Sequence, residues 1–246
     1  MEKILDDFVS QCIEKVNIES TISWKSMHYI WKLYLSSINL PNMVYLTQLQ
    51  LLLSSKIEHT NENGNFIFIN VTSKYLPSVS SFISFWDKYI TITNDTNNDD
   101  EYEIDELMTL YKTSDTKNTQ LSDVNMIKMI CHYFTPQVEV IDNKYVTNIK
   151  CNLWSKHDDI NDFLQSYKFN KTNSSFTNKN SQNSNVEIIS FNDLYQSYKM
   201  YFKAKENVEQ NIYLIVSKQF FEKYITNKLT NYIKFETFVS SEWLEQ

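Results

Sequence analysis

Histidine and cysteine are few in this chain, with four and three residues. One cluster, His157-Asp158-Asp159, places an imidazole beside two carboxylates. Such a group can hold a metal ion or transfer a proton. The cluster follows Trp154 and precedes a helical apolar pattern, so we interpret it as the first turn of a helix with an aspartate as its cap. The sequence therefore favours a structural role for this cluster over a catalytic one.

The three cysteines give no clear metal site. Cys12, Cys131 and Cys151 form no Cys-x-x-Cys pair, whereas structural zinc needs clustered thiolates and imidazoles. The one possible grouping joins Cys131-His132 to Cys151 and His157, and adjacent side chains on a helix point apart. We expect buried free thiols, and we expect neither a metal nor another cofactor.

Glycine and arginine are nearly missing from the composition. The chain has one glycine, Gly64, and all 23 of its basic residues are lysine. Nucleotide-binding loops need several glycines, because backbone amides must approach phosphate without an intervening Cβ. Arginine supplies the bidentate clamp on phosphate or guanine. We therefore expect no nucleotide hydrolysis and no catalytic residues.

An internal repeat indicates the elements that position the remaining polar residues. Residues 22–35 resemble residues 189–202, and a fainter third copy contains Ile104, Leu107 and Tyr111. The large residues recur at i, i+3, i+7, i+10 and i+11, which confines them to one face of a helix. We expect equivalent helices with these faces buried. The equivalent residues are Trp24, Met27, Trp31, Tyr34 and Leu35 in the first copy, and Phe191, Leu194, Tyr198, Tyr201 and Phe202 in the last.

A second helix and a β-hairpin follow each of these predicted helices. Ser122 and Ser217 precede helical apolar patterns, as N-caps do. Asn63-Gly64 and Asp142-Asn143 separate pairs of candidate strands, as hairpin turns do. In the last copy we predict a strand over 235–239. Helix, loop, helix and hairpin is the order of a winged helix, so the predicted fold class is helix-dominated α+β, with tandem winged-helix-like modules and small β-hairpins.

We predict four segments. Residues 1–95 hold an N-terminal helix and the first winged-helix-like module, and residues 96–167 hold the middle module. Residues 168–187 are rich in Asn and Ser and too poor in apolar residues to offset their ordering entropy, so we expect a disordered linker. Residues 188–246 hold the C-terminal module.

Charge distinguishes the last module from the others. The formal net charge of the chain is −7, yet residues 191–234 hold seven lysines against four acidic residues. Lysines on a winged helix can neutralise DNA phosphates. The second helices of the other two modules carry few lysines, which indicates packing or protein binding. The predicted nucleic-acid-binding residues are Lys199, Lys203, Lys218, Gln219, Lys223, Thr226 and Lys228.

A family resemblance rests on residues 191–199, 217–221 and 232–233. They resemble the small winged-helix module at the C-terminal end of phage, plasmid and poxvirus-type primase–helicases, as do Trp24, Met27 and Trp31-Lys32. The chain lacks that family's Walker motifs and polymerase carboxylates. The resemblance implies a non-enzymatic accessory or C-terminal module of a viral DNA replication primase–helicase. It would bind replication proteins or a helicase subunit, and DNA weakly. The alternative is an acidic protein–protein interaction scaffold built from winged-helix folds.

Composition also suggests where the protein works. Asn, Lys, Ile, Tyr and Phe dominate, as expected from an AT-rich genome such as that of a large DNA virus, a protist or a parasitic bacterium. The N-terminus is acidic and has no signal-peptide pattern, and no apolar run reaches the length of about 18 residues that spans a bilayer. We expect a cytoplasmic protein, in the host cytoplasm or a viral factory if viral. We expect no membrane contact and no small-molecule substrate.

Overall fold

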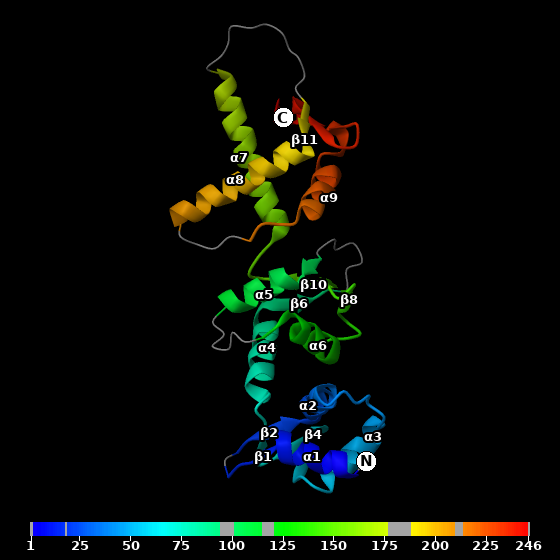
Figure 1. Cartoon of the computed structure of the whole chain (residues 1–246). Coiled ribbons are helices and arrows are strands. Elements are labelled where there is room, and N and C mark those ends of the chain that lie inside the picture. The colour runs from blue at the N-terminus through cyan, green and yellow to red at the C-terminus, as the bar shows by residue number, and fades with distance from the viewer. Residues whose placement is uncertain are drawn as a thin grey trace. The chain divides into compact units, whose positions relative to one another are not determined.

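The computed structural model describes residues 2–17, 19–93, 101–114, 121–176, 188–209 and 214–245. Helices dominate, and the strands form small antiparallel sheets of two or three strands (Figure 1). The predicted fold class is confirmed. The chain forms two compact units, Met1–Leu153 and Trp154–Gln246, and each unit is described by itself.

The first module of the first unit is a winged helix preceded by a helix. Its three-stranded sheet has the order β2-β4-β3, so the strand before the helix pair joins the hairpin that follows it. A separate pair, β1 with β5, closes the module. The elements are α1 (Glu2–Cys12), β1 (Glu14–Lys15), β2 (Thr21–Ser23), α2 (Trp24–Ser37), α3 (Leu46–Ser54), β3 (His59–Glu62), β4 (Asn65–Ile69) and β5 (Val71–Thr72).

The second module repeats this order element by element. Its sheet has the order β7-β9-β8, and β6 pairs with β10 as β1 pairs with β5. The elements are α4 (Leu76–Tyr89), β6 (Ile90–Ile92), β7 (Tyr102–Glu103), α5 (Ile104–Thr113), α6 (Asp123–Tyr133), β8 (Glu139–Ile141), β9 (Tyr145–Thr147) and β10 (Ile149–Cys151).

The second unit is the third module, with the sheet order β11-β13-β12. A 3-10 turn, η1 (Thr230–Tyr232), precedes its hairpin, and another, η2 (Ser241–Glu245), follows it. The remaining elements are α7 (Lys156–Phe176), β11 (Ile188–Ser190), α8 (Phe191–Glu209), α9 (Lys218–Lys228), β12 (Ile233–Lys234) and β13 (Phe238–Ser240).

One aromatic contact recurs in all three modules. The residue seven positions after the start of the middle helix is Trp31, Tyr111 or Tyr198, and each is fully buried. Each ring meets a phenylalanine from the preceding helix in an edge-to-face geometry, which is the favoured arrangement for aromatic pairs. The ring centroids are 5.1 Å apart for Phe8–Trp31, 5.3 Å for Phe85–Tyr111 and 5.5 Å for Phe163–Tyr198, with interplanar angles of 87°, 87° and 85°.

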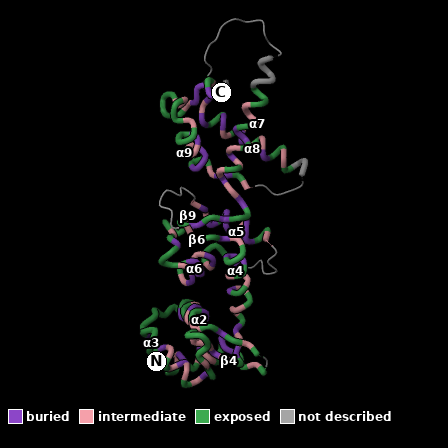
Figure 2. Tube along the Cα trace, turned by 180° about the vertical axis from the view of Figure 1, so that it is seen from behind, coloured by how far each residue is buried: buried purple, intermediate pink, exposed green. Residues whose placement is uncertain are grey.

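The sheets repeat the same register. In each three-stranded sheet, a residue of the strand before the middle helix pairs with a fully buried residue of the second hairpin strand. The pairs are Ile22–Phe68, Tyr102–Val146 and Ile189–Val239. In Figure 2, buried and exposed residues alternate along α8, as burial of one helix face requires. The expected stripe is buried in both helices, except that Trp24 and Tyr201 are half-buried. The repeat seen in the sequence is therefore a repeat of complete packing units.

Turns and caps follow local sequence. Ser122 and Ser217 cap α6 and α9 through their hydroxyl oxygens, as predicted. Asn63 and Gly64 both have positive φ, as a type I′ hairpin turn requires. The predicted strand over 235–239 is wrong at its start, because Phe235 and Glu236 adopt left-handed φ values in the hairpin turn and β13 begins at Phe238.

The four segments predicted from the sequence stay a prediction, and their boundaries differ from those of the two observed units. The division between units falls at Leu153 and Trp154, so α7 lies with the third module. Residues 168–176, the start of the predicted linker, form the last turns of α7. Residues 177–187 lie outside the described residues.

Trp31→Ala tests the repeated aromatic contact. The substitution removes a buried ring that packs on Phe8 and Tyr34, so we expect the free energy of unfolding to fall by about 3–5 kcal/mol. Leu51→Ala, at an exposed position of α3, should change it by less than about 0.5 kcal/mol. Urea unfolding followed by circular dichroism measures both, and equal losses would contradict the packing described here.

Candidate nucleic-acid interface

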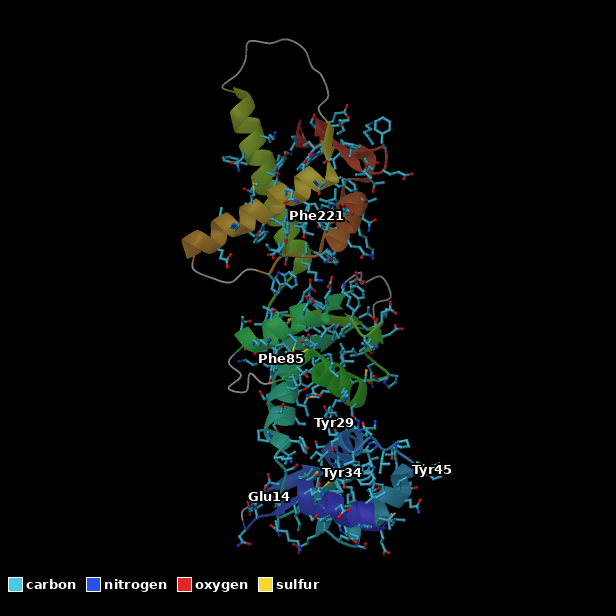
Figure 3. All side chains as sticks on the ribbon, viewed as in Figure 1. Glu14, Tyr29, Tyr34, Tyr45, Phe85 and Phe221 are labelled. Carbon is cyan, nitrogen blue, oxygen red and sulfur yellow. The ribbon has the colours of Figure 1, made fainter. Side chains whose placement is uncertain are left out.

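The helix α9 buries one face and exposes the other. Phe220, Phe221 and Ile225 are buried, and the Phe221 ring contacts the rings of Tyr198 and Phe163 at centroid distances of 5.1 and 6.2 Å. In Figure 3, Phe221 lies inside the third module. These inward residues fix the rotation of the helix about its axis. The opposite face, which begins at Gln219, is therefore turned outward.

The seven residues predicted to bind nucleic acid fall on two adjacent helices. Lys218, Gln219, Lys223, Thr226 and Lys228 are exposed on α9. Lys203 is exposed on α8. Lys199 lies one turn earlier on α8, half-buried, with its Nζ 5.2 Å from the centroid of the Tyr195 ring. The Tyr195 ring in turn lies 5.4 Å from Phe221 of α9.

Lys218 is held at the start of α9 by two neighbours. Its Nζ donates a hydrogen bond to Asn192 Oδ1 at 3.2 Å and lies 3.6 Å from Glu222 Oε1. An exposed i,i+4 ion pair of this kind contributes little stability. A phosphate can therefore replace the carboxylate of Glu222 at small cost.

The equivalent helix of the first module presents an apolar surface. Leu51 of α3 is 71% exposed, and the loop before α3 exposes Met43 by 75% and Tyr45 by 83%. In Figure 3, Tyr45 points away from the core of its module. No lysine lies within α3. This face does not suit a phosphate backbone.

The equivalent helix of the second module is covered by the first module. Lys25 of α2 donates a hydrogen bond from Nζ to the carbonyl oxygen of Tyr133, at 2.7 Å, and the Tyr133 hydroxyl donates to Ser26 Oγ at 3.2 Å. Tyr29 packs on the rings of His132 and Tyr133. The last turn of α6 is therefore part of an intramolecular interface and is not free to enter a DNA groove.

A half-buried histidine lies in this interface. The His28 ring stacks on Trp24, with ring centroids 6.0 Å apart, and lies 5.2 Å from the His132 ring. Burial, together with the nearby Lys32 and His132, lowers the pKa of His28 to about 4. His28 therefore packs as a neutral side chain near pH 7.

The cluster His157-Asp158-Asp159 forms the first turn of α7, as predicted. The cap itself is Ser155, whose Oγ accepts a hydrogen bond from the Asp158 backbone N–H at 3.2 Å. Trp154 Nε1–H donates to Asp159 Oδ2 at 2.6 Å, while burial raises the pKa of the Asp159 carboxyl. Within the described residues, no three His, Cys, Asp or Glu side chains are grouped so that they could hold a metal ion.

The three cysteines, all within the described residues, form no disulfide, and they differ in exposure. Cys12 and Cys151 are buried, as expected, and burial raises the pKa of the Cys12 thiol. Cys131 is exposed, so the expectation of burial is wrong there. On α6, Cys131 lies on a different face from the buried Ile130 and Tyr133.

Comparison with known proteins gives no relative. No protein-family model, curated protein or solved structure matches this chain. Among the described residues, no helix has both the length and the apolar character needed to cross a bilayer.

The half-buried His28 makes stability depend on pH. An unfolded histidine has a pKa near about 6.5, so between pH 6.5 and 4 the unfolded chain binds more protons than the folded one. Stability is therefore complete above this window and is lost as the pH falls through it. We expect the unfolding free energy of the wild type to fall more than that of His28→Gln between about pH 7.5 and about pH 5. Urea titrations at both values measure this, and identical losses would refute it.

Proposed function

We propose that this chain is a non-enzymatic nucleic-acid-binding protein whose third module contacts the DNA backbone. One observation carries the proposal. Of the three equivalent second helices, all within the described residues, α9 alone combines exposure with several lysines. The α3 helix exposes leucines instead, and α6 packs against α2.

The distribution of charge supports this division. Residues 154–246 contain eleven lysines and eleven acidic residues, so the whole formal charge of −7 lies in residues 1–153. Repulsion of a polyanion is therefore strongest at the first unit and weakest at the second. A local excess of lysine on α8 and α9 can then act on DNA at short range, within a Debye length of roughly 10 Å.

The chemistry of the surface limits the kind of binding. In winged-helix proteins the second helix enters the major groove and the hairpin approaches the backbone. The hairpin of the third module carries Lys234 and the exposed Phe235 at its turn. Lysine neutralises phosphate as a point charge, and without arginine the bidentate contact to guanine is missing. We propose weak binding with little sequence preference.

The link to replication rests on the resemblance of α8 and α9 to the C-terminal module of primase–helicases. This resemblance supports the proposal that the protein is an accessory or C-terminal module of a viral replication primase–helicase. In that setting the third module holds DNA, while the first unit contacts replication proteins or a helicase subunit.

Charge reversal on α9 tests the DNA contact. We expect Lys218→Glu, Lys223→Glu and Lys228→Glu together to remove measurable binding of the full chain to a labelled duplex at low salt. For the wild type, about three phosphate contacts predict that log affinity falls with log salt at a slope of about −3. Fluorescence anisotropy measures both quantities, with a single strand as a second probe.

The matched control reverses Lys74, Lys112 and Lys150, which are exposed lysines of the first unit. It changes the net charge equally, so it should lower affinity far less than the α9 variant does. Equal losses in the two triple variants would mean that only net charge matters and would refute a binding face on α9.

A second candidate function is an acidic protein-interaction scaffold. The observation that favours it is the apolar patch formed by Leu40, Met43, Tyr45, Leu46 and Leu51, all exposed. Exposed apolar groups that lie close together mark interaction sites. Beside them, Lys56 just beyond α3 pairs with Asp6 of α1 at 2.6 Å. A partner with an apolar surface fits this arrangement.

Photo-crosslinking tests the scaffold. A photoreactive residue at Leu51 should crosslink a helicase subunit added to the full chain, and Met43→Asp should abolish the product because it places a charge in the patch. The same residue at Val124, an exposed apolar position of α6, should give no product. Crosslinking that survives Met43→Asp would rule out the patch as the docking site.

A further inference from the structure

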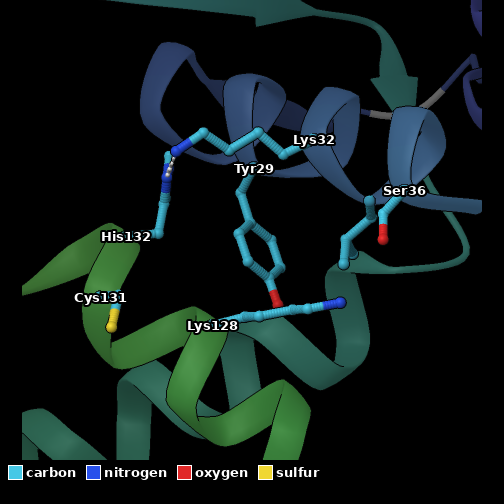
Figure 4. A pocket seen from close by; sticks show the side chains of 7 residues that line it. Tyr29, Lys32, Ser36, Lys128, Cys131 and His132 are labelled. Carbon is cyan, nitrogen blue, oxygen red and sulfur yellow. Dashed lines mark hydrogen bonds between the residues drawn. The ribbon is translucent and has the colours of Figure 1, made fainter. Parts of the chain in front are cut away.

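A pocket of about 280 Å³ lies between α2 of the first module and α6 of the second. Figure 4 shows its side chains approaching from both helices. Its size is close to the lower end of roughly 300–1,000 Å³ usual for small-molecule sites. The lining residues are Tyr29, Lys32, Leu33, Ser36, Lys128, Cys131 and His132.

The polar groups of the pocket favour an anion. Lys32 and Lys128 each carry a full positive charge, Ser36 adds a hydroxyl donor, and none of the described lining residues is a carboxylate. Lys32 and Ser36 lie in the second half of α2, where the helix dipole contributes about −0.5 charge. Two ammonium groups outweigh that partial charge. The net potential in the pocket is positive.

The hydrogen-bond partner of Lys32 is a neutral imidazole. His132 Nε2–H donates a hydrogen bond to the Lys25 carbonyl oxygen at 2.8 Å, which leaves Nδ1 as an acceptor for Lys32 Nζ at 3.4 Å. Burial lowers the pKa of His132, in keeping with this neutral form. Neither Lys32 nor Lys128 forms an ion pair with a described carboxylate.

Tyr29 supplies the second and independent sign of a ligand. Its side chain is buried, the residue being 2% exposed, and its hydroxyl has no hydrogen-bond partner in the described part of the chain. Figure 4 shows the ring running from α2 toward Lys128. A buried hydroxyl without a partner is destabilising, because it has lost water and gained nothing. A ligand oxygen in the pocket would satisfy it.

We propose that this pocket binds a small organic phosphate monoester. The phosphate oxygens accept hydrogen bonds from Lys32, Lys128 and the Tyr29 hydroxyl, and a compact apolar body packs against Leu33 and the aliphatic stems of the lysines. Charge-assisted hydrogen bonds from ammonium groups to phosphate are stronger than neutral ones. The site lies in the first unit, and it is independent of the DNA-binding face on α9.

Phenyl phosphate is the probe for this site. Inorganic phosphate and phenol, the two halves of the probe, are tested separately for comparison. Cys131 lines the pocket and is exposed, whereas Cys12 and Cys151 are buried, so the rate at which a thiol reagent modifies Cys131 reports occupancy at this place. We expect phenyl phosphate to slow that reaction in the full chain and to raise Tm, because a ligand that binds only the folded state stabilises it. Each half should bind at least about 10-fold more weakly.

Two variants separate binding from folding. Tyr29→Phe and Lys128→Gln should each weaken phenyl phosphate binding by roughly 10-fold, through loss of one polar contact. Lys112→Gln, an exposed lysine of α5, should bind like the wild type. Tyr29→Phe should leave the unliganded Tm equal or higher, because it deletes an unpaired buried hydroxyl and keeps the ring. A purely structural role would not combine that gain with weaker binding.

The outcomes are decisive in both directions. Protection of Cys131 that weakens in Tyr29→Phe and Lys128→Gln, and not in Lys112→Gln, supports the site. No protection of wild-type Cys131 at millimolar phenyl phosphate, or equal protection in all four proteins, would overturn it. Inorganic phosphate binding as tightly as phenyl phosphate would overturn the apolar part of the proposal.

Discussion

The edge-to-face contact between a phenylalanine of the leading helix and the aromatic residue at the eighth position of the middle helix organises every module. In all three copies the pair has nearly the same distance and angle, although Trp31 is replaced by tyrosine in the other two. Because the larger ring is fully buried, it sets the spacing between the two helices. The first strand of each three-stranded sheet is fixed with the middle helix, because β2, β7 and β11 each end at the residue before that helix begins.

Repetition of one scaffold leaves function to surfaces that the core does not constrain. The equivalent helices α3, α6 and α9 differ in what they present, because only their inward residues must match the aromatic core. The α3 helix presents leucine, α6 presents a face to its neighbour, and α9 presents lysine and polar side chains. A chain of three similar modules can thus hold separate binding surfaces without any change in fold.

The contact between α2 and α6 contains both satisfied and unsatisfied polar groups. It is stabilised by hydrogen bonds from Lys25 and Tyr133, yet it leaves the Tyr29 hydroxyl and His28 Nε2 buried without partners in the described residues. Native interfaces normally satisfy such groups. The interface between α2 and α6 therefore contains polar atoms that a bound ligand could satisfy.

The sequence by itself determined the local structure. Periodic aromatic residues placed the middle helices, serines marked the starts of α6 and α9, and Asn63-Gly64 fixed a hairpin, because helix faces, caps and turns depend on neighbours in the chain. It missed the caps Ser23 of α2 and Ser190 of α8, whose hydroxyl oxygens accept hydrogen bonds from the backbone N–H groups of Ser26 and Asp193. It also missed the leading helices α4 and α7 as members of the repeat, because the distance from each leading helix to the next strand varies. Only the tertiary structure decided which second helix is exposed and which is covered. Lys25 and Tyr133 are 108 positions apart, and no local pattern specifies that such distant residues will meet.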